Sequence, residues 1–454
     1  MFEKVLIANR GEIAVRVIAA CKDLGIRTVA IYSEADRSAL HVRHADEALC
    51  IGPAKAADSY LNVPAVISAA EITGADAIHP GYGFLAENAA FAEVCEVSGL
   101  AFIGPPSQAI RLMGDKARAR RAMRDAGVPI LPGTEEAVDS LDDAKKAAEE
   151  IGYPLIIKAA AGGGGRGMRV VRQSKDLESA YNQAQTEAAA SFSCADVYIE
   201  KFIDRPRHIE FQVLGDSYGR VVSLGERECS VQRRHQKLLE EAPSSRVSPE
   251  LRDRIGKTIE GALSAIAYSN AGTVEFLMDE RGDLHFIELN ARIQVEHPVT
   301  EMVTGIDLVK SQLLLASGAR IEDILPGAIE IKGHAIECRI NAENPDTFAP
   351  SAGLITRFIP PGGIGVRVDS AAYSDWFVPP YYDSLVAKLI VHGPNRTDSM
   401  ARMRRALDVF VVEGIHTSIP LQQRILADEG FIGGDYDTHF IERLLSQQLS
   451  RIVS

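Results

Sequence analysis

Two glutamates, Glu275 and Glu288, stand in a pattern that could bind a metal ion. They lie in two strand-like segments, 273–279 and 284–290, and the four residues between these segments predict a turn. If the last residue of the first strand faces the first residue of the second, Glu275 lies directly opposite Glu288. Facing carboxylates destabilise a sheet unless a cation lies between them, so this pair predicts a magnesium site. With a turn of another length, both glutamates would simply face water.

A polar side chain stands at every second position from Glu288 to Glu296. In an extended chain this alternation places all of them, Asn290 included, on one face, which an ordinary solvated strand would also show. Arg292 could hold a small oxyanion with its planar guanidinium, Gln294 could orient that anion, and Glu296 could accept a proton from it. Because the run starts at the expected metal ligands, the pattern favours an anion site, and bicarbonate would fit all three side chains.

A run of glycines at 162–167 is the third candidate for chemistry. It contains the spacing of a dinucleotide-binding loop, but residues 168–171 predict a strand, whereas such a loop must open a helix. Met168 also stands where a phosphate-binding P-loop requires a lysine and a hydroxyl residue. The run therefore predicts a hairpin loop after the strand 155–158, whose backbone amides could cover phosphates while Lys158 supplies positive charge. An ordinary surface turn is the alternative.

These candidates need elements that hold them, and the sequence predicts three parts joined by a helix. Residues 1–114 alternate apolar strands with helical patterns such as 13–24, which predicts a parallel α/β domain. The basic stretch 115–129 predicts a connecting helix, and 130–203 contains the glycine hairpin. Residues 204–454 show short alternating segments and turns, which predict a C-terminal domain with a large antiparallel sheet and flanking helices. The strands expected in the first part are Lys4–Ala8, Arg27–Tyr32, Ala75–His79 and Leu100–Gly104.

Composition and charge narrow the functional classes. The 454 residues carry a formal net charge of -13, which disfavours nucleic acids and acidic membranes as partners. The sequence has no signal peptide pattern and no apolar run of membrane-spanning length, so we expect a cytoplasmic protein. Its six cysteines include no Cys-x-x-Cys pair, which predicts small buried thiols rather than disulfides or a zinc site.

Several motifs resemble those of known enzymes. The stretches Tyr153–Lys158, with the glycine loop, and Phe286–Arg292 look like the signatures shared by biotin carboxylases and carbamoyl-phosphate synthetases, which are ATP-grasp enzymes. Three further stretches resemble biotin carboxylases specifically, namely His79–Asn88, Arg292–Glu301 and His334–Asn341. The resemblance covers essentially the whole chain, with slight departures at Ala86, where serine is usual, and Ala291, where threonine, proline or serine is common. It implies that residues 130–203 form the ATP-grasp lid domain.

The resemblance also assigns individual residues to ligands. The residues that would bind ATP, including two of the glycine loop, are Lys116, Lys158, Gly164, Gly165, Glu200, Lys201, Ile203, His208, Gln232 and His235. Magnesium or manganese would be held by Glu275, Glu288 and Asn290. The residues implied to bind bicarbonate are Lys237, Arg292, Gln294, Val295 and Glu296. Arg339 would stabilise the anion that forms on biotin, and it completes a catalytic set with Lys237, Arg292 and Glu296.

The implied activity is that of a ligase that carboxylates biotin at the expense of ATP. Glu296 would remove the proton of bicarbonate, whose oxygen then attacks the γ-phosphate of ATP to form carboxyphosphate. This intermediate would break down to carbon dioxide and phosphate, and the phosphate would deprotonate biotin. Closure of the lid domain would keep water from hydrolysing the intermediate.

The resemblance implies partners as well. Biotin is normally attached to a lysine within Met-Lys-Met, yet none of the eight methionines here precedes a lysine. The chain is therefore expected to act on a separate biotin carboxyl carrier protein, together with carboxyltransferase subunits, as in an acetyl-CoA carboxylase of fatty acid biosynthesis or a related acyl-CoA carboxylase. The family also suggests a homodimer. Two alternatives stay open: another ATP-grasp ligase, such as a carbamoyl-phosphate synthetase-like or carboxylate-amine ligase, and a non-enzymatic nucleotide-binding protein.

Overall fold

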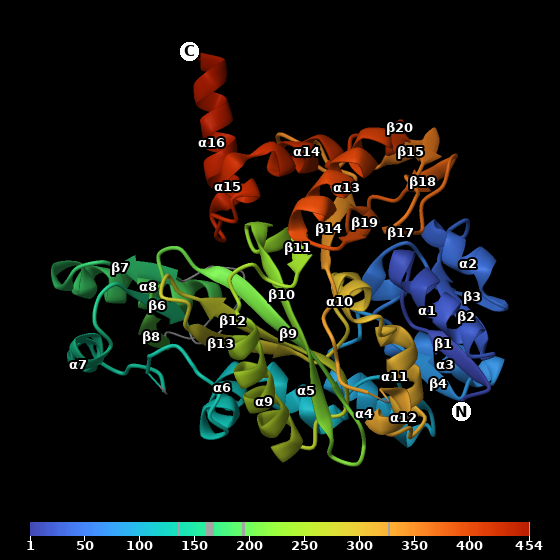
Figure 1. Cartoon of the computed structure of the whole chain (residues 1–454). Helices are drawn as coiled ribbons and strands as arrows, with labels where there is room; N and C mark the ends of the chain where they lie inside the picture. Colours follow the sequence, from blue (N-terminus) through green and yellow to red (C-terminus); the bar gives the residue numbers. More distant parts are fainter. Residues whose placement is uncertain (135, 160–167, 193–195, 326, 454) are drawn as a thin grey trace.

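The computed structural model describes residues 1–134, 136–159, 168–192, 196–325 and 327–453. Its N-terminal part contains a five-stranded parallel sheet with the order β3-β2-β1-β4-β5 (Figure 1). The four expected strands are present as β1 (Lys4–Ile7), β2 (Arg27–Ser33), β4 (Ala77–His79) and β5 (Ala101–Phe102). The strand β3 (Glu47–Gly52) was not expected, because its apolar run, residues 48–51, is short and only one of its six side chains is buried. The helices of this part are α1 (Gly11–Asp23), η1 (Glu34–Asp36), α2 (Leu40–His44), η2 (Ala56–Asp58), α3 (Val63–Thr73) and α4 (Ala89–Val97).

Two helices connect this part to the rest of the chain. They are α5 (Ser107–Gly114) and the expected basic helix, α6 (Lys116–Asp125). Asp115 precedes α6, and its carboxylate accepts a hydrogen bond from the backbone N–H of Arg118, which caps the helix. Lys116 therefore stands at the first position of a helix that packs against β13 of the large sheet.

A small three-stranded sheet, with the order β7-β6-β8, lies at the end of the molecule opposite the N-terminal sheet (Figure 1). The expected hairpin is confirmed, because β6 (Leu155–Ala159) and β7 (Met168–Val171) pair antiparallel, with Lys158 opposite Met168. The glycine loop that joins these strands, with Gly164 and Gly165, lies outside the described residues. The remaining elements here are α7 (Leu141–Ile151), η3 (Ser174–Asp176), α8 (Leu177–Phe192) and β8 (Val197–Lys201).

The expected large antiparallel sheet has eight strands in the order β13-β12-β9-β10-β11-β14-β19-β17. These strands are β9 (Arg207–Gly215), β10 (Val221–Arg233), β11 (Gln236–Ala242), β12 (Asn270–Met278), β13 (Leu284–Asn290), β14 (His334–Asn341), β17 (Val366–Ser370) and β19 (Leu385–Gly393). Two short ladders pair β15 (Gly353–Ile355) with β18 (Trp376–Val378), and β16 (Arg357–Ile359) with β20 (Val411–Glu413). The accompanying helices are α9 (Pro249–Ala265), α10 (His297–Thr304), α11 (Leu308–Ala316), α12 (Ile321–Ile324), α13 (Arg396–Val409), α14 (Ile419–Ala427), α15 (Glu429–Ile432) and α16 (Phe440–Val453).

Two details of the expected strands are wrong. The alternation from Glu288 to Glu296 does not continue as a strand, since β13 ends at Asn290 and the chain then runs irregularly into α10. The expected facing of Asp279 and Leu284 is also wrong, because Met278 pairs with Leu284. A bulge in β13 then shifts the register by one residue, and Glu275 does pair with Glu288.

The cysteines depart from the expectation at one position. All five cysteines in the described part of the chain are free, and four of them are buried. Cys50, on the edge strand β3, is exposed instead. Cys194 lies outside the described residues. Nowhere in the described ranges is a helix both long and apolar enough to cross a membrane.

Candidate active site

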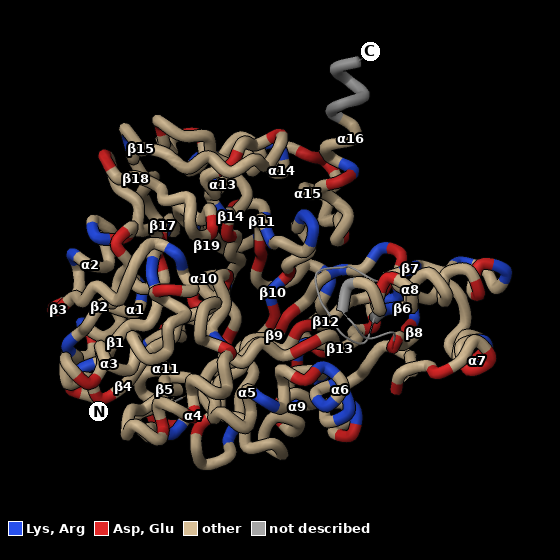
Figure 2. Tube along the Cα trace, turned by 180° about the vertical axis from the view of Figure 1, so that it is seen from behind, with Lys and Arg blue, Asp and Glu red and all other residues tan. Residues whose placement is uncertain are grey.

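Acidic residues recur along the central strands of the large sheet (Figure 2), and several of them are buried around one lysine. Lys237, near the start of β11, has its Nζ 2.5 Å from Glu210 Oε2, 2.6 Å from Glu296 Oε1 and 3.1 Å from Glu275 Oε1. Burial opposes the charge of the ammonium group, but these three carboxylates outweigh it and raise the pKa of Lys237 well above its usual value. A permanent positive charge therefore lies at the centre of the cluster.

Glu296 holds the position next to this charge. It directly precedes α10, and its side chain accepts hydrogen bonds from Lys237 over 2.6 Å and from Arg339 Nη2 over 3.0 Å. Burial favours the neutral acid, but Lys237, Arg339 and Arg227 outweigh burial and lower the pKa of Glu296 well below its usual range. The side chain is thus a carboxylate at neutral pH, which is the state that can accept a proton.

Arg292 and Gln294 both lie within the irregular segment, residues 291–296, that joins β13 to α10. Gln294 Nε2 donates to Glu275 Oε1 over 2.7 Å, so Gln294 joins the buried cluster. Arg292 lies at the boundary with solvent, and its Nε donates to Glu87 Oε2 over 2.8 Å while its Nη2 donates to Asn290 Oδ1 over 3.0 Å. The guanidinium is therefore held in place and remains partly accessible. Directly after Gln294, the backbone carbonyl of Val295 accepts a hydrogen bond from Lys388, a buried lysine of β19.

The expected metal ligands meet at the edge formed by β12 and β13. Glu275 is buried and accepts a hydrogen bond from Asn290 Nδ2 over 2.9 Å, whereas Glu288 is about one-third exposed and lies 3.5 Å from Lys116 Nζ. Burial is outweighed by Lys237 and other donors, which hold the pKa of Glu275 well below its usual range. Two carboxylates and an amide oxygen are the ligands that magnesium and manganese prefer, so this donor set fits such an ion.

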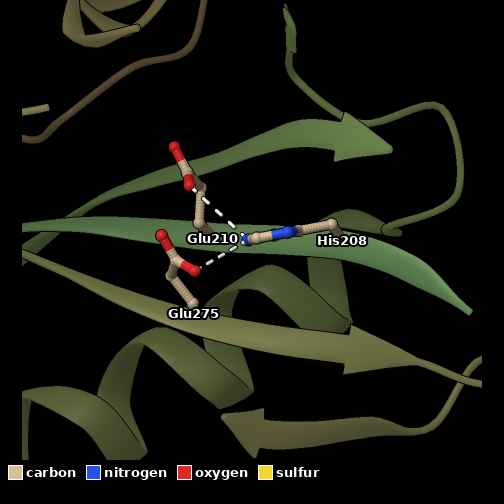
Figure 3. Close-up of side chains that lie close together, drawn as sticks. All are labelled: His208, Glu210 and Glu275. Atoms are coloured by element: carbon tan, nitrogen blue, oxygen red, sulfur yellow. Dashed lines mark ion pairs between the residues drawn. The ribbon is translucent and has the colours of Figure 1, made fainter. Parts of the chain in front are cut away.

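A second group with possible metal ligands lies beside the first. His208, Glu210 and Glu275 project from the neighbouring strands β9 and β12 (Figure 3), with His208 Nε2 3.0 Å from Glu275 Oε2 and 3.8 Å from Glu210 Oε2. Glu288 is not part of this group. Lys237 already contacts both of these glutamates, so the two carboxylates have a cationic partner without a metal ion.

The residues expected at ATP are spread over two parts of the molecule. On the small sheet, Lys158 Nζ lies 2.5 Å from Glu200 Oε2, and Lys201 Nζ donates to the carbonyls of Gly152 and Tyr153. On the large sheet, Gln232 pairs with Lys237 across β10 and β11. His235 lies in the turn between these strands, and Ile203 follows β8. The side chain of Lys116 is 69% exposed.

Sequence reasoning missed several residues that organise this site. Arg227 is fully buried, and its guanidinium donates to Glu210, Gln212, Thr273, Gln294 and Thr300, over distances from 2.5 to 3.2 Å. Glu87 orients Arg292 from the N-terminal part, and Glu240 pairs with Arg339. Their partners lie far away in the sequence, so no local pattern could have indicated these roles.

Comparisons with known proteins agree with this arrangement. The family models described as "Biotin carboxylase, N-terminal domain", "Carbamoyl-phosphate synthase L chain, ATP binding domain" and "Biotin carboxylase C-terminal domain" match residues 1–110, 115–324 and 337–443. The chain is 55% identical over 444 residues to biotin carboxylase 1 of Bacillus subtilis, covering 97% of this chain and 98% of the relative.

Solved structures give the same result. The biotin carboxylase domain of a thermophilic 2-oxoglutarate carboxylase, solved bound to bicarbonate, superposes with a TM-score of 0.93 at 50% identity, covering 98% of this chain and 99% of that one. The corresponding domain dimer from Hydrogenobacter thermophilus, with MgADP and bicarbonate, has a TM-score of 0.89 at 51% identity and the same coverage. The chain therefore belongs to the biotin carboxylase family.

Proposed function

We propose that the protein uses ATP and bicarbonate to carboxylate biotin on a carrier protein, through carboxyphosphate. One observation carries this proposal: Glu296 is a buried carboxylate held between two cations, Lys237 and Arg339. A base that must take a proton from a small oxyanion needs such an arrangement, because the cations attract the anion while the carboxylate stays ionised.

Bicarbonate would bind where Lys237, Arg292, Gln294, Val295 and Glu296 meet. Arg292 offers a planar fork to the anion, and its bond to Glu87 already fixes the orientation of that fork. Glu296 would then remove the bicarbonate proton, which leaves an oxygen free to attack the γ-phosphate of ATP. Arg339 would face the anion that develops on biotin in the second step.

The nucleotide would bind between the small sheet and the edge of the large one. Support comes from the side chains of Lys116, Lys158 and His208, which can donate hydrogen bonds to phosphate oxygens. The residues that complete the proposed set are Glu200, Lys201, Ile203, Gln232 and His235, with Gly164 and Gly165 in the covering loop. Glu275, Glu288 and Asn290 would hold the magnesium or manganese ion. That ion supplies positive charge that neutralises the phosphate groups during phosphoryl transfer. The segment 130–203 is proposed to close over the nucleotide as a lid.

The same proposal extends to the partners. The chain is expected to carry no biotin itself and to act on a biotin carboxyl carrier protein, with carboxyltransferase subunits completing an acetyl-CoA or related acyl-CoA carboxylase in the cytoplasm. A homodimer is supported by the relative that was solved as a domain dimer. Copurification of the chain with its partners would identify the final acceptor.

The proposal is tested by measuring carboxybiotin formation and ADP release by the purified chain. Both should require ATP, magnesium and bicarbonate together, and carboxybiotin should form on free biotin or on a biotinylated carrier. Omission of bicarbonate is the control that should abolish both. ADP release that requires an amine and ignores biotin would instead identify a carboxylate-amine or carbamoyl-phosphate synthetase-like ligase.

A further inference from the structure

Two glutamates outside the proposed binding set, Glu240 and Glu337, face each other inside the large sheet. They are paired directly across β11 and β14, and both side chains are fully buried. Residues opposite each other in an antiparallel pair have their Cβ atoms about 4.5–5.5 Å apart. Two carboxyl groups are therefore neighbours in an interior that excludes water.

Arg339 connects this pair to the proposed active site. Its Nε donates to Glu240 Oε1 over 2.6 Å, and its Nη2 donates to Glu296 Oε2 over 3.0 Å. The guanidinium is thus held between the carboxylate that would accept the bicarbonate proton and a second carboxylate behind it. Any change in the charge of Glu240 must alter how strongly Arg339 is held.

The other oxygens of the pair receive no donor. In the part of the chain that the structure describes, Glu240 Oε2 and both oxygens of Glu337 have no hydrogen-bond partner. The nearby buried Lys388 is used elsewhere, by Glu12 at 3.1 Å and by the carbonyl of Val295 at 2.9 Å. An ionised carboxylate that is buried without a partner is so costly that it takes up a proton instead.

The electrostatic surroundings agree with this reasoning. Burial raises the pKa of Glu240 to about 7, although Arg339 opposes the shift. Burial also raises the pKa of Glu337 well above its usual range; Lys388 opposes this, and the charge of Glu240 adds to it. The charged or titratable groups near the pair, from β10, β11, β14, β19 and the start of α10, are Cys229, Lys237, Cys338, Arg339, Lys388 and Glu296.

We propose that Glu240 and Glu337 share one proton at neutral pH, and that Glu240, in this state, is a positioning residue for Arg339. The shared proton satisfies oxygens that otherwise have no partner, and it leaves one negative charge behind Arg339 instead of two. The second half of this inference rests on the proposed role of Arg339 at biotin.

The shared proton has a consequence for catalysis. When Glu296 takes the bicarbonate proton, Arg339 loses one of its two anionic partners, and its charge becomes available to the biotin anion. Above the pH at which the pair loses its proton, two full carboxylates would instead compete with biotin for Arg339. Biotin carboxylation should therefore decline at alkaline pH before bicarbonate-dependent ATP cleavage does, because the latter does not need the biotin anion.

Infrared spectroscopy tests the shared proton without reference to activity. The carbonyl stretch of a protonated carboxylic acid is well separated from the carboxylate bands and shifts in D₂O. At neutral pH, the wild-type protein should show a band of this kind that Glu337→Gln lacks, because Glu240 alone is ionised by Arg339. The matched control Glu330→Gln changes an exposed glutamate and should retain the band. The shared proton is overturned if Glu337→Gln shows an equally strong band. It is also overturned if the band of the wild-type protein persists when the pH is raised.

Kinetics test the positioning role. The amide of Glu337→Gln can still donate to Glu240, so its kcat/KM for biotin at neutral pH should stay within a few-fold of wild type and should lack the alkaline decline. Glu240→Gln removes the anion that holds Arg339, and misplacement of a catalytic group by about 1 Å can cost about 10²-fold. We expect a loss of that order in kcat/KM for biotin, at least tenfold larger than the loss in biotin-independent ATP cleavage.

Failure of this inference can be told apart from failure of the proposed function. If Arg339→Ala leaves biotin carboxylation intact, the proposed role of Arg339 is wrong. The positioning role of Glu240 is overturned if Arg339→Ala impairs biotin carboxylation but Glu240→Gln lowers biotin carboxylation and biotin-independent ATP cleavage equally. It is also overturned if Glu240→Gln lowers neither activity. The infrared band judges the shared proton in either case.

Discussion

The bicarbonate side and the nucleotide side of the site differ in how their charges are held. Lys237 is only 12% exposed and lies within 3.1 Å of three carboxylates, whereas Lys116 is 69% exposed and lies 3.5 Å from one. The buried charges gain from a low effective dielectric and from many hydrogen bonds, while the exposed pair is screened by water. The large sheet therefore fixes the anion site in advance, whereas Lys116, one of the cations proposed for ATP, is held only loosely and can move to meet the triphosphate.

The largest effect is expected on the buried side, from Glu296→Gln. This variant removes the proposed base before any phosphoryl transfer, so ATP cleavage and biotin carboxylation should fall together by about 10²- to 10⁴-fold. ADP release and carboxybiotin formation measure both losses. Glu280→Gln, which changes an exposed residue in the turn before β13, is the control and should match wild type. Unequal losses in Glu296→Gln would separate Glu296 from the bicarbonate step.

A smaller and more selective loss is expected for Arg339→Ala. Loss of one stabiliser of a developing anion typically costs about 10²- to 10³-fold, and here that cost should fall on biotin carboxylation. Slow ATP cleavage without biotin should be lowered far less. The same two assays, with and without biotin, provide the measurement. If Arg339→Ala loses basal ATP cleavage as fully as Glu296→Gln, Arg339 serves the bicarbonate step and the division of roles is wrong.

The contrast in burial should also appear in stability. Arg227→Met breaks the buried ion pair with Glu210 and removes the donor that Arg227 supplies to four other buried side chains, and the loss of a buried pair typically costs about 3–5 kcal/mol. Lys116→Met removes the same charge from an exposed contact and should cost less than about 1 kcal/mol. Denaturant titration followed by fluorescence of Trp376 compares the two variants directly. Equal destabilisation would contradict the distinction between a fixed and a loose set of charges.

The smallest effect is expected on the pH dependence of stability, from the buried and neutral side chain of His41. Burial lowers the pKa of His41 to about 4. The folded protein therefore takes up this proton only near pH 4, whereas the unfolded chain takes it up near about pH 6.5. Stability from His41 is therefore present above about pH 6.5 and is lost as the pH falls toward 4, at up to about 1.4 kcal/mol per pH unit. His41→Gln should reduce this acid sensitivity in unfolding titrations, whereas His44→Gln, at an exposed position, should leave the slope unchanged.

Local patterns in the sequence predicted the elements better than their junctions. The apolar strand β1 and the hairpin of β6 and β7 were predicted correctly, because each follows from a pattern within a short stretch of sequence. The short edge strand β3 and the end of β13 at Asn290 were not identified, because pairing with neighbouring strands, rather than local pattern, determines them. The pairing of Glu275 with Glu288 was predicted correctly from a wrong register at the turn, because a bulge in β13 shifts the pairing back by one residue.

The supporting residues of the site could not be predicted from local patterns. Glu87 and Arg292 are 205 positions apart, and Arg339 meets Glu240 across 99 positions. A buried ion pair between distant segments leaves no periodic signal in the sequence. Each partner, considered alone, cannot be distinguished from an ordinary charged surface residue. The family resemblance assigned residues to ligands. The structure adds the side chains that hold those residues in position.

The five described thiols differ sharply in their reactivity toward labelling reagents. Burial raises the pKa of Cys21 and of Cys95 to about 12, and it raises the pKa of Cys229 and Cys338 well above the usual value, so these four are protonated at neutral pH. The thiolate is the form that reacts with alkylating reagents, and Cys50 alone among the described cysteines is open to solvent. Among the described cysteines, a maleimide fluorophore would therefore attach to Cys50, at the outer edge of the N-terminal sheet and on a strand that contributes nothing to the proposed site.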